Sequence, residues 1–203
     1  MEENDNNLRS PAHIASMTAA FEGSLAIIAV VLGWAFGVMP TETLVWSLPA
    51  IGWGMAATGP MLLLLWVCVT VPWRALGDLT RTVEETVRPL LQGCSLVDLA
   101  AISLLAGLGE EMLFRGFLQQ LIAEWVGGSA GIWVGLAVAS VTFGLLHAIT
   151  PVYAVVACLI GAYLGWLWLA TGNLLAPITA HAVYDFLALV YFLRIRPGRG
   201  EDS

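Results

Sequence analysis

Residues 95–125 read SLVDLAAISLLAGLGEEMLFRGFLQQLIAEW, a membrane-length apolar run interrupted by the charged segment Gly109–Gly116. This segment brings three ionisable side chains together within six residues: Glu110, Glu111 and Arg115. The chain from 96 to 193 is otherwise nearly free of charge, which predicts a succession of membrane helices. An ionisable side chain inside such a helix is costly to bury, so it is a functional-site hypothesis by default.

The composition is that of an integral membrane protein. Of the 203 residues, 59% are hydrophobic and 11% are charged, and the mean hydropathy is +0.83. A soluble domain of this length would carry roughly 25% charged residues. At about 20 residues per spanning helix, the apolar runs can supply five to seven spans. We expect an all-α fold: a polytopic membrane helix bundle of about six transmembrane helices plus an amphipathic interfacial helix, surrounded by membrane lipids.

The remaining bulk properties exclude other classes of protein. The net charge of −7 lies mainly in the tails and in one linker, which leaves no basic face for nucleic acid. The cysteines, Cys68, Cys94 and Cys158, do not have the spacing of a metal site.

The chain divides into five parts along its length. We expect a polar N-terminal tail at 1–18, two transmembrane helices within 19–71, an amphipathic linker at 72–96, a membrane core at 97–193 and a polar C-terminal tail at 194–203. Ser10-Pro11 is interpreted as a break before the first helix. That helix is predicted at Phe21–Met39, with Glu22 near its end and within reach of the interface.

The core is predicted to hold four spans, at 96–125, 131–147, 152–171 and 174–193. The first of these has about 30 residues and would measure roughly 45 Å as an α-helix. It must therefore be strongly tilted, or bent near Gly107–Gly109, to fit the bilayer.

The arginines predict the orientation of the chain. With six spans, one side of the membrane collects seven of the eight arginines, at positions 9, 74, 81, 88, 194, 196 and 199. The positive-inside rule makes this side cytoplasmic, together with the linker and both termini. The eighth is Arg115, in the charged segment.

Helical spacing separates the two glutamates. Glu111 and Arg115 are four residues apart and face each other, so an ion pair offsets part of their burial cost. Glu110 points about 100° away and lacks that partner, which suits a general base. The alternative is that both glutamates pair with Arg115 and only hold helices together.

Two further polar positions lie in separate spans. His147 ends one span, and His181 and Asp185 lie four residues apart on one face of another. Together with Glu110 they can hold a water, a metal ion or a proton path. By residue counting, Glu110 and His181 lie roughly 18–20 Å from the cytoplasmic helix ends, whereas His147 lies near the end of its span. Tilt or a break must bring them together; a separation of His147 and Glu110 above about 10 Å would contradict water activation.

These residues resemble the motifs of the CPBP family of intramembrane proteases, also called Abi, which includes CAAX-processing endopeptidases and bacteriocin-processing or immunity proteins. The family motifs Glu-Glu-x-x-x-Arg, Phe-x-x-x-His and His-x-x-x-Asn/Asp are matched in order, each on its own span. The matching residues are Glu110, Glu111 and Arg115, then Phe143 and His147, then His181 and Asp185. The resemblance covers about residues 72–193.

The resemblance implies a hydrolase, an endopeptidase that cleaves peptide bonds within the membrane. Glu110 would be the general base that activates a water with His147, and Glu111, Arg115 and Phe143 would support the site. His181 and Asp185 would stabilise the oxyanion, although Asp185 stands where Asn is typical and an ionised Asp would repel an oxyanion. Asp185 must therefore be protonated, orient His181 or help to bind a metal. The family has been described both as metalloproteases and as metal-free glutamate proteases; in the first case Glu110, His147 and His181 would bind a divalent ion such as zinc.

Other functions and the substrate stay open at this stage. The alternative from another class is a non-proteolytic membrane scaffold or bacteriocin-immunity protein, against which the complete motif set argues. A proton-coupled transporter would need an internal repeat, and the two halves show none. The expected substrate is a membrane-associated peptide or a prenylated protein, and the sequence leaves its cleavage site and the oligomeric state open.

Overall fold

The computed structural model describes residues 10–196, and every regular element in this range is helical. In chain order these elements are α2 (Pro11–Phe36), η1 (Pro40–Thr43), α3 (Leu48–Thr70), α4 (Arg74–Leu91), α5 (Leu96–Glu111), η2 (Met112–Gln119), α6 (Gln120–Val126), α7 (Gly128–Leu146), α8 (Pro151–Thr171), α9 (Leu175–Val190) and η3 (Tyr191–Ile195). The predicted all-α bundle is confirmed.

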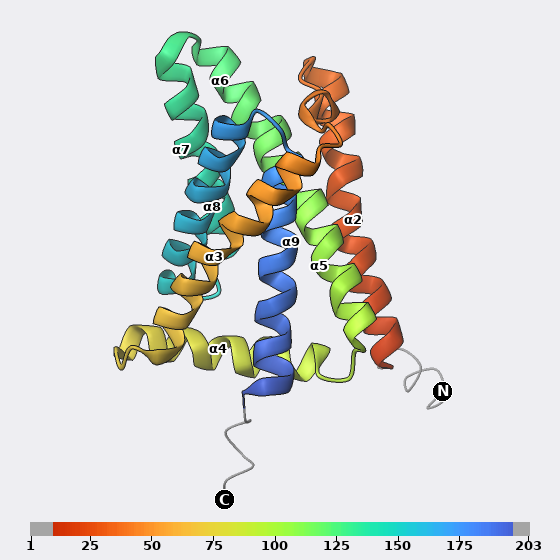
Figure 1. Cartoon of the computed structure of the whole chain (residues 1–203), viewed down its shortest axis with the longest axis vertical. Helices are drawn as coiled ribbons and strands as arrows, with labels where there is room; N and C mark the ends of the chain where they lie inside the picture. Colours follow the sequence, from red (N-terminus) through yellow and green to blue (C-terminus); the bar gives the residue numbers. More distant parts are fainter. Residues whose placement is uncertain (1–9, 197–203) are drawn as a thin grey trace, which may run out of the picture.

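Five helical segments are long and apolar enough to cross a membrane: α2, α3, α7, α8 and the continuous α9–η3. The count rises to six when α4 and the stretch from Leu96 to Val126, which meet at 117°, are taken as one broken span. In Figure 1, α4 lies across one end of the bundle, whereas α5 and α6 run along it. The predicted polytopic helical bundle is therefore confirmed, with five to six candidate spans.

The first helix begins earlier than the sequence suggested. The side chain of Ser10 caps α2 by accepting a hydrogen bond from the amide of His13, and Pro11 occupies the first helical turn. Proline is compatible with that position because its missing N–H would have no helical partner there. The predicted tail at 1–18 was therefore too long, and Glu22 lies well inside α2 instead of at its end. Residues 1–9 and 197–203, the outer parts of both tails, lie outside the described residues.

The long helix through the charged segment is not broken at its glycines. Leu96–Val126 is continuous, and it departs from regular α geometry later, in the π-helical segment η2. Gly107 and Gly109 instead allow close packing: a Cβ on Gly107 would lie 2.9 Å from the backbone nitrogen of Ala182, and one on Gly109 would collide with the carbonyl oxygen of Glu22. These glycines therefore let α9 and α2 approach α5 at the level of the site.

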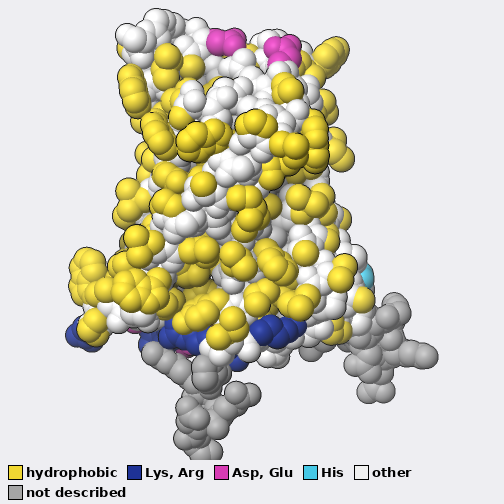
Figure 2. Space-filling view, in the orientation of Figure 1, with side chains coloured by type: hydrophobic (Ala, Val, Ile, Leu, Met, Phe, Trp, Pro, Cys, Tyr) yellow, Lys and Arg dark blue, Asp and Glu magenta, His cyan; other side chains and the backbone are white. Residues whose placement is uncertain are grey.

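Polar contacts tie α4 to the end of α9–η3. Arg88 donates to the carbonyl oxygens of Phe192 (2.7 Å) and Arg196 (2.6 Å), and Arg196 pairs with Glu84 at 2.7 Å. Figure 2 shows arginine side chains at this end of the molecule, acidic side chains at the opposite end and mostly hydrophobic side chains between them. One end of the bundle is thus closed by a charged, amphipathic layer.

Substituting Gly109 by alanine tests the close packing. The added methyl group meets the backbone of α2, so we expect Gly109→Ala to destabilise the fold by about 1–3 kcal/mol. Gly52→Ala is the matched control because a Cβ there meets nothing within 4 Å. Unfolding by sodium dodecyl sulfate in mixed micelles measures both variants. Equal midpoints for the two would contradict the packing role of Gly109.

Candidate active site

A buried ion pair forms the foundation of the polar cluster. Arg115 donates to Glu111 at 2.6 Å, and their side chains are 1% and 0% exposed. The second terminal nitrogen of Arg115 donates to the carbonyl oxygen of Gly161 on α8 at 2.9 Å. The guanidinium also lies over the ring of Phe143, 4.7 Å from its centroid. Among the described residues Arg115 pairs with Glu111 alone, so the alternative in which both glutamates pair with it is wrong.

A second contact repeats this link one turn further on. Gln119 donates to the carbonyl oxygen of Gly165 at 3.4 Å, four residues after Arg115 contacts Gly161. Gly165 leaves room for this contact, since a Cβ there would lie 2.6 Å from the side-chain oxygen of Gln119 and would require that side chain to shift. Gln119 was not among the site residues predicted from the sequence. Its position in the sequence could have indicated this contact, because Gln119 is an amide side chain in an apolar span, four residues after Arg115. Gly161 and Gly165, also four residues apart, provide the matching carbonyl groups on α8.

His147 follows the last residue of α7 and is held by Phe143. Its Nδ1 lies 2.8 Å from the carbonyl oxygen of Phe143, and the two rings stack with centroids 4.3 Å apart. A carbonyl oxygen can only accept, so Nδ1 carries a proton and Nε2 faces the site. Nε2 lies 3.7 Å from a carboxylate oxygen of Glu110. The turn between α7 and α8 does not reach the level of α4 in Figure 1, which explains how His147 meets the deeper Glu110.

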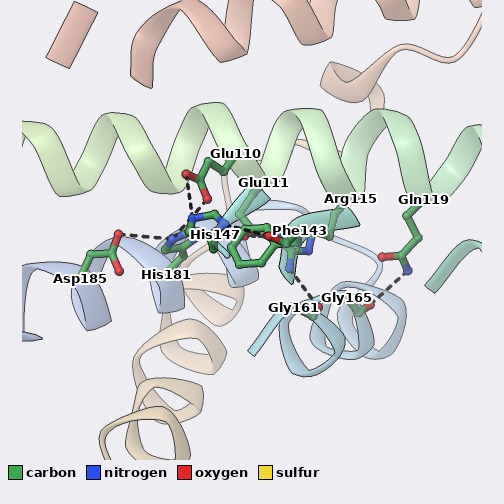
Figure 3. A network of polar contacts seen from close by, with 10 residues as sticks. All are labelled: Glu110, Glu111, Arg115, Gln119, Phe143, His147, Gly161, Gly165, His181 and Asp185. Atoms are coloured by element: carbon green, nitrogen blue, oxygen red, sulfur yellow. Dashed lines mark hydrogen bonds and ion pairs between the residues drawn. The ribbon is translucent and has the colours of Figure 1, made fainter. Parts of the chain in front are cut away.

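His181, on α9, lies between three carboxylates (Figure 3). Its Nδ1 is 2.8 Å from Glu111, which leaves Nε2 to face Asp185 at 3.3 Å and Glu110 at 3.8 Å. Glu111 thus bonds both Arg115, on the same continuous helix, and His181 on α9, and Arg115 extends this network to α8. Each ring nitrogen of His181 therefore faces at least one carboxylate oxygen that can accept a hydrogen bond.

The four predicted catalytic residues come together around one cavity. Glu110, His147, His181 and Asp185 all line a space of about 310 Å³, although they come from α5, the C-terminal cap of α7 and α9. The predicted separation of Glu110 from Arg115 is confirmed, but Glu110 lies between two histidines rather than alone. The rest of the lining is mostly apolar and comes largely from α3, α4, α8 and α9. The cavity also contains Glu22, Tyr153 and Tyr184, which the sequence analysis did not assign to the site.

The arrangement does not match a metal site as it lies. Within residues 10–196, no group of three or more His, Cys, Asp or Glu side chains is placed to hold a metal ion. The family resemblance implies Glu110, His147 and His181 as ligands. The carboxylate oxygens of Glu110 lie 3.7 Å from Nε2 of His147 and 3.8 Å from Nε2 of His181.

Fold and site define a class: a polytopic helical membrane protein with a buried Glu/His centre that suits acid–base hydrolysis. Residues 92–187 match the family described as type II CAAX prenyl endopeptidase Rce1-like, and this domain is consistent with the CPBP family. At the family level this supports a CAAX-type intramembrane protease.

The chain is also similar to a curated protein of bacterial origin. The chain is 31% identical to the uncharacterized protein YpbD of Bacillus subtilis (strain 168) over 117 residues, which cover 53% of each chain. The chain therefore spans about half the length of this relative. No solved structure gives a significant match.

Removing Arg115 should destabilise the protein strongly. Arg115→Ala leaves Glu111 charged and buried beside His181, and we expect a loss of about 3–5 kcal/mol. Arg81→Ala removes the arginine of another pair with a spacing of four residues, Arg81–Glu85, but that pair is exposed, and the expected loss is about 0–1 kcal/mol. Denaturation in mixed micelles compares the two. Similar losses would show that the Glu111–Arg115 pair does not hold the core.

Proposed function

We propose that this protein is an intramembrane endopeptidase of the glutamate type, which hydrolyses a peptide bond with a water activated by Glu110 and His147. The observation that carries the proposal is the position of Glu110. Its two carboxylate oxygens lie 3.7 and 3.8 Å from the Nε2 atoms of His147 and His181, at the wall of a cavity of about 310 Å³.

The gap between Glu110 and His147 is too long for a direct hydrogen bond and suits a bridging water. A water about 2.8 Å from both atoms would donate one hydrogen bond to Glu110 and one to Nε2 of His147. Phe143 fixes the His147 ring by stacking and by its carbonyl, so the lone pair of Nε2 stays directed into the cavity. Glu110 then takes the proton as the water oxygen attacks the scissile carbonyl carbon.

His181 is suited to stabilise the negative charge that develops on the carbonyl oxygen. As an imidazolium it can donate from Nε2 to this oxyanion while Nδ1 stays bonded to Glu111. Asp185, 3.3 Å from Nε2, acts as a counter-ion that keeps His181 protonated and oriented. In this role Asp185 contacts His181 and does not have to contact the oxyanion. When the C–N bond breaks, Glu110 returns its proton to the leaving amine, which yields a carboxylic acid and an amine.

Access to the cavity is proposed from the cytoplasmic side, beneath α4. The cavity lining includes the apolar side chains of α4, and this helix lies at the arginine-rich end of the bundle. Both termini would then be cytoplasmic. The substrate would be a membrane-associated peptide or a prenylated protein whose apolar part contacts α3 and α4.

The orientation is tested by cysteine labelling in a variant without the native cysteines. We expect Glu42→Cys, at the end opposite α4, to react with a membrane-impermeant maleimide in intact cells. Glu85→Cys, exposed on α4, should react only after permeabilisation, because the arginine-rich side is retained in the cytoplasm. The reverse pattern would place the active-site opening outside the cell.

Neutralising Glu110 tests the assignment of the general base. Glu110→Gln keeps the shape of the side chain but cannot accept the proton, so we expect cleavage to fall at least 100-fold, on the order of a general-base contribution. The chromosomal gene is deleted, and the wild type, Glu110→Gln or the control Glu124→Gln is expressed in its place. The measurement compares the membrane peptides of these three strains. Glu124 is exposed and contacts Gln120, away from the cavity.

Two outcomes would contradict this proposal. Cleavage that survives Glu110→Gln at equal expression rules out Glu110 as the base. If Glu110→Ala and His147→Ala both retain full cellular function, the protein acts as a non-proteolytic scaffold or immunity protein instead.

A further inference from the structure

Glu22 is a carboxylate of the active-site cavity that belongs to none of the three motifs. It lies on α2, and it lines the same cavity as Glu110, His147, His181 and Asp185. Gly109, the residue before Glu110, explains the position of Glu22. Because Gly109 has no side chain, the backbone of α2 at Glu22 can pack directly against α5. The two glutamates are thereby held at the same depth of the bundle.

The cavity has an excess of negative groups. Glu22, Glu110 and Asp185 contribute carboxylates to it, and no arginine is among its lining residues. Arg115, the arginine inside the bundle, is already bonded to Glu111 and Gly161. One oxygen of Glu22 and one of Glu110 are buried without a hydrogen-bond partner among the described residues. Buried carboxylate oxygens are normally paired, so this side of the cavity favours a cationic ligand.

The remainder of the cavity has the opposite character. Apolar side chains of α3 and α4 line it, including Leu64, Leu65, Leu79, Val83 and Val87. A ligand that satisfies both parts is amphipathic: a positively charged group beside Glu22, followed by an apolar segment against α3 and α4.

We propose that Glu22 is a specificity-determining residue that binds a lysine or arginine side chain of the substrate close to the scissile bond. This inference rests on the proposed peptidase function and adds a substrate class to it. Glu110 receives the proton of the water and Asp185 is engaged with His181, so Glu22 is the carboxylate of the cavity that is left to pair with the substrate cation. A charge-assisted pair of this kind changes kcat/KM by about tenfold or more.

The test begins with a peptide library produced from a proteome by a glutamate-specific protease, so that lysine and arginine remain internal. The full-length protein in lipid nanodiscs is incubated with the library, and new peptide ends are identified by mass spectrometry against the Glu110→Gln variant. We expect lysine or arginine to be enriched at one position within about three residues of the cleaved bond, the reach of a side chain in the cavity.

A pair of synthetic peptides then measures the role of Glu22. Both carry the best-cleaved sequence, with lysine or with the neutral norleucine at the enriched position. We expect Glu22→Gln to lower kcat/KM for the lysine peptide about tenfold more than for the norleucine peptide, mainly through KM. Glu22→Asp, which keeps the charge, should retain part of the preference. Glu42→Gln, on the opposite end of the bundle, should keep the wild-type ratio.

The possible failures are distinguishable. If the wild type yields no ends beyond those of Glu110→Gln, the proposed function fails and this inference with it. If cleavage occurs without enrichment of basic residues, the peptidase stands and the role of Glu22 is overturned. An equal loss on both peptides in Glu22→Gln would make Glu22 a structural residue of the α2–α5 contact and would also overturn it.

Discussion

The carboxylate of Glu111 is the interaction on which the site depends. It accepts hydrogen bonds from Arg115 and His181, and Arg115 in turn bonds the carbonyl oxygen of Gly161. The Glu111–Arg115 pair therefore joins the continuous helix α5–η2 to α8 and α9. In a membrane interior an unpaired charge is costly, so each member of this network keeps the others in place. The arrangement also fixes which face of His181 is available for chemistry.

Close helix packing brings the network to its working geometry. Glycines stand where α5 meets α2 and α9, and larger residues at Gly107 and Gly109 would collide with backbone atoms of the neighbouring helices. In a lipid environment small residues drive helix association through close contact, since there is little hydrophobic force between helices. The π-helical segment η2 carries Arg115 and Gln119 to carbonyls four residues apart on α8. Helix packing and polar contacts thus favour the same alignment of η2 against α8.

Much of the site was predictable because its spacing is local. Residues four apart share a helix face, which predicted Glu111–Arg115 and His181–Asp185, and both contacts are present. Contacts between helices were not predictable in this way. The link of Gln119 to Gly165, the second bond of Glu111 to His181 and the place of Glu22 in the cavity depend on how helices are rotated against one another. The start of α2 was misjudged since a Ser-Pro pair can either break a helix or cap its beginning, and local sequence does not choose between them.

The sequence by itself determined the class of fold, the membrane spans of the core and the candidates for the chemistry. Apolar runs of membrane length and isolated ionisable residues carry that information, because burying charge in lipid is expensive whatever the tertiary structure. Only the tertiary structure decided that Glu110 faces both histidines, that the α7–α8 turn is deep enough for His147 to reach it, and that Glu22 joins the cavity. The physical reason is that depth and rotation are set by contacts between residues distant in the chain. Those contacts are made by glycines and backbone carbonyls, whose roles leave no periodic pattern in the sequence.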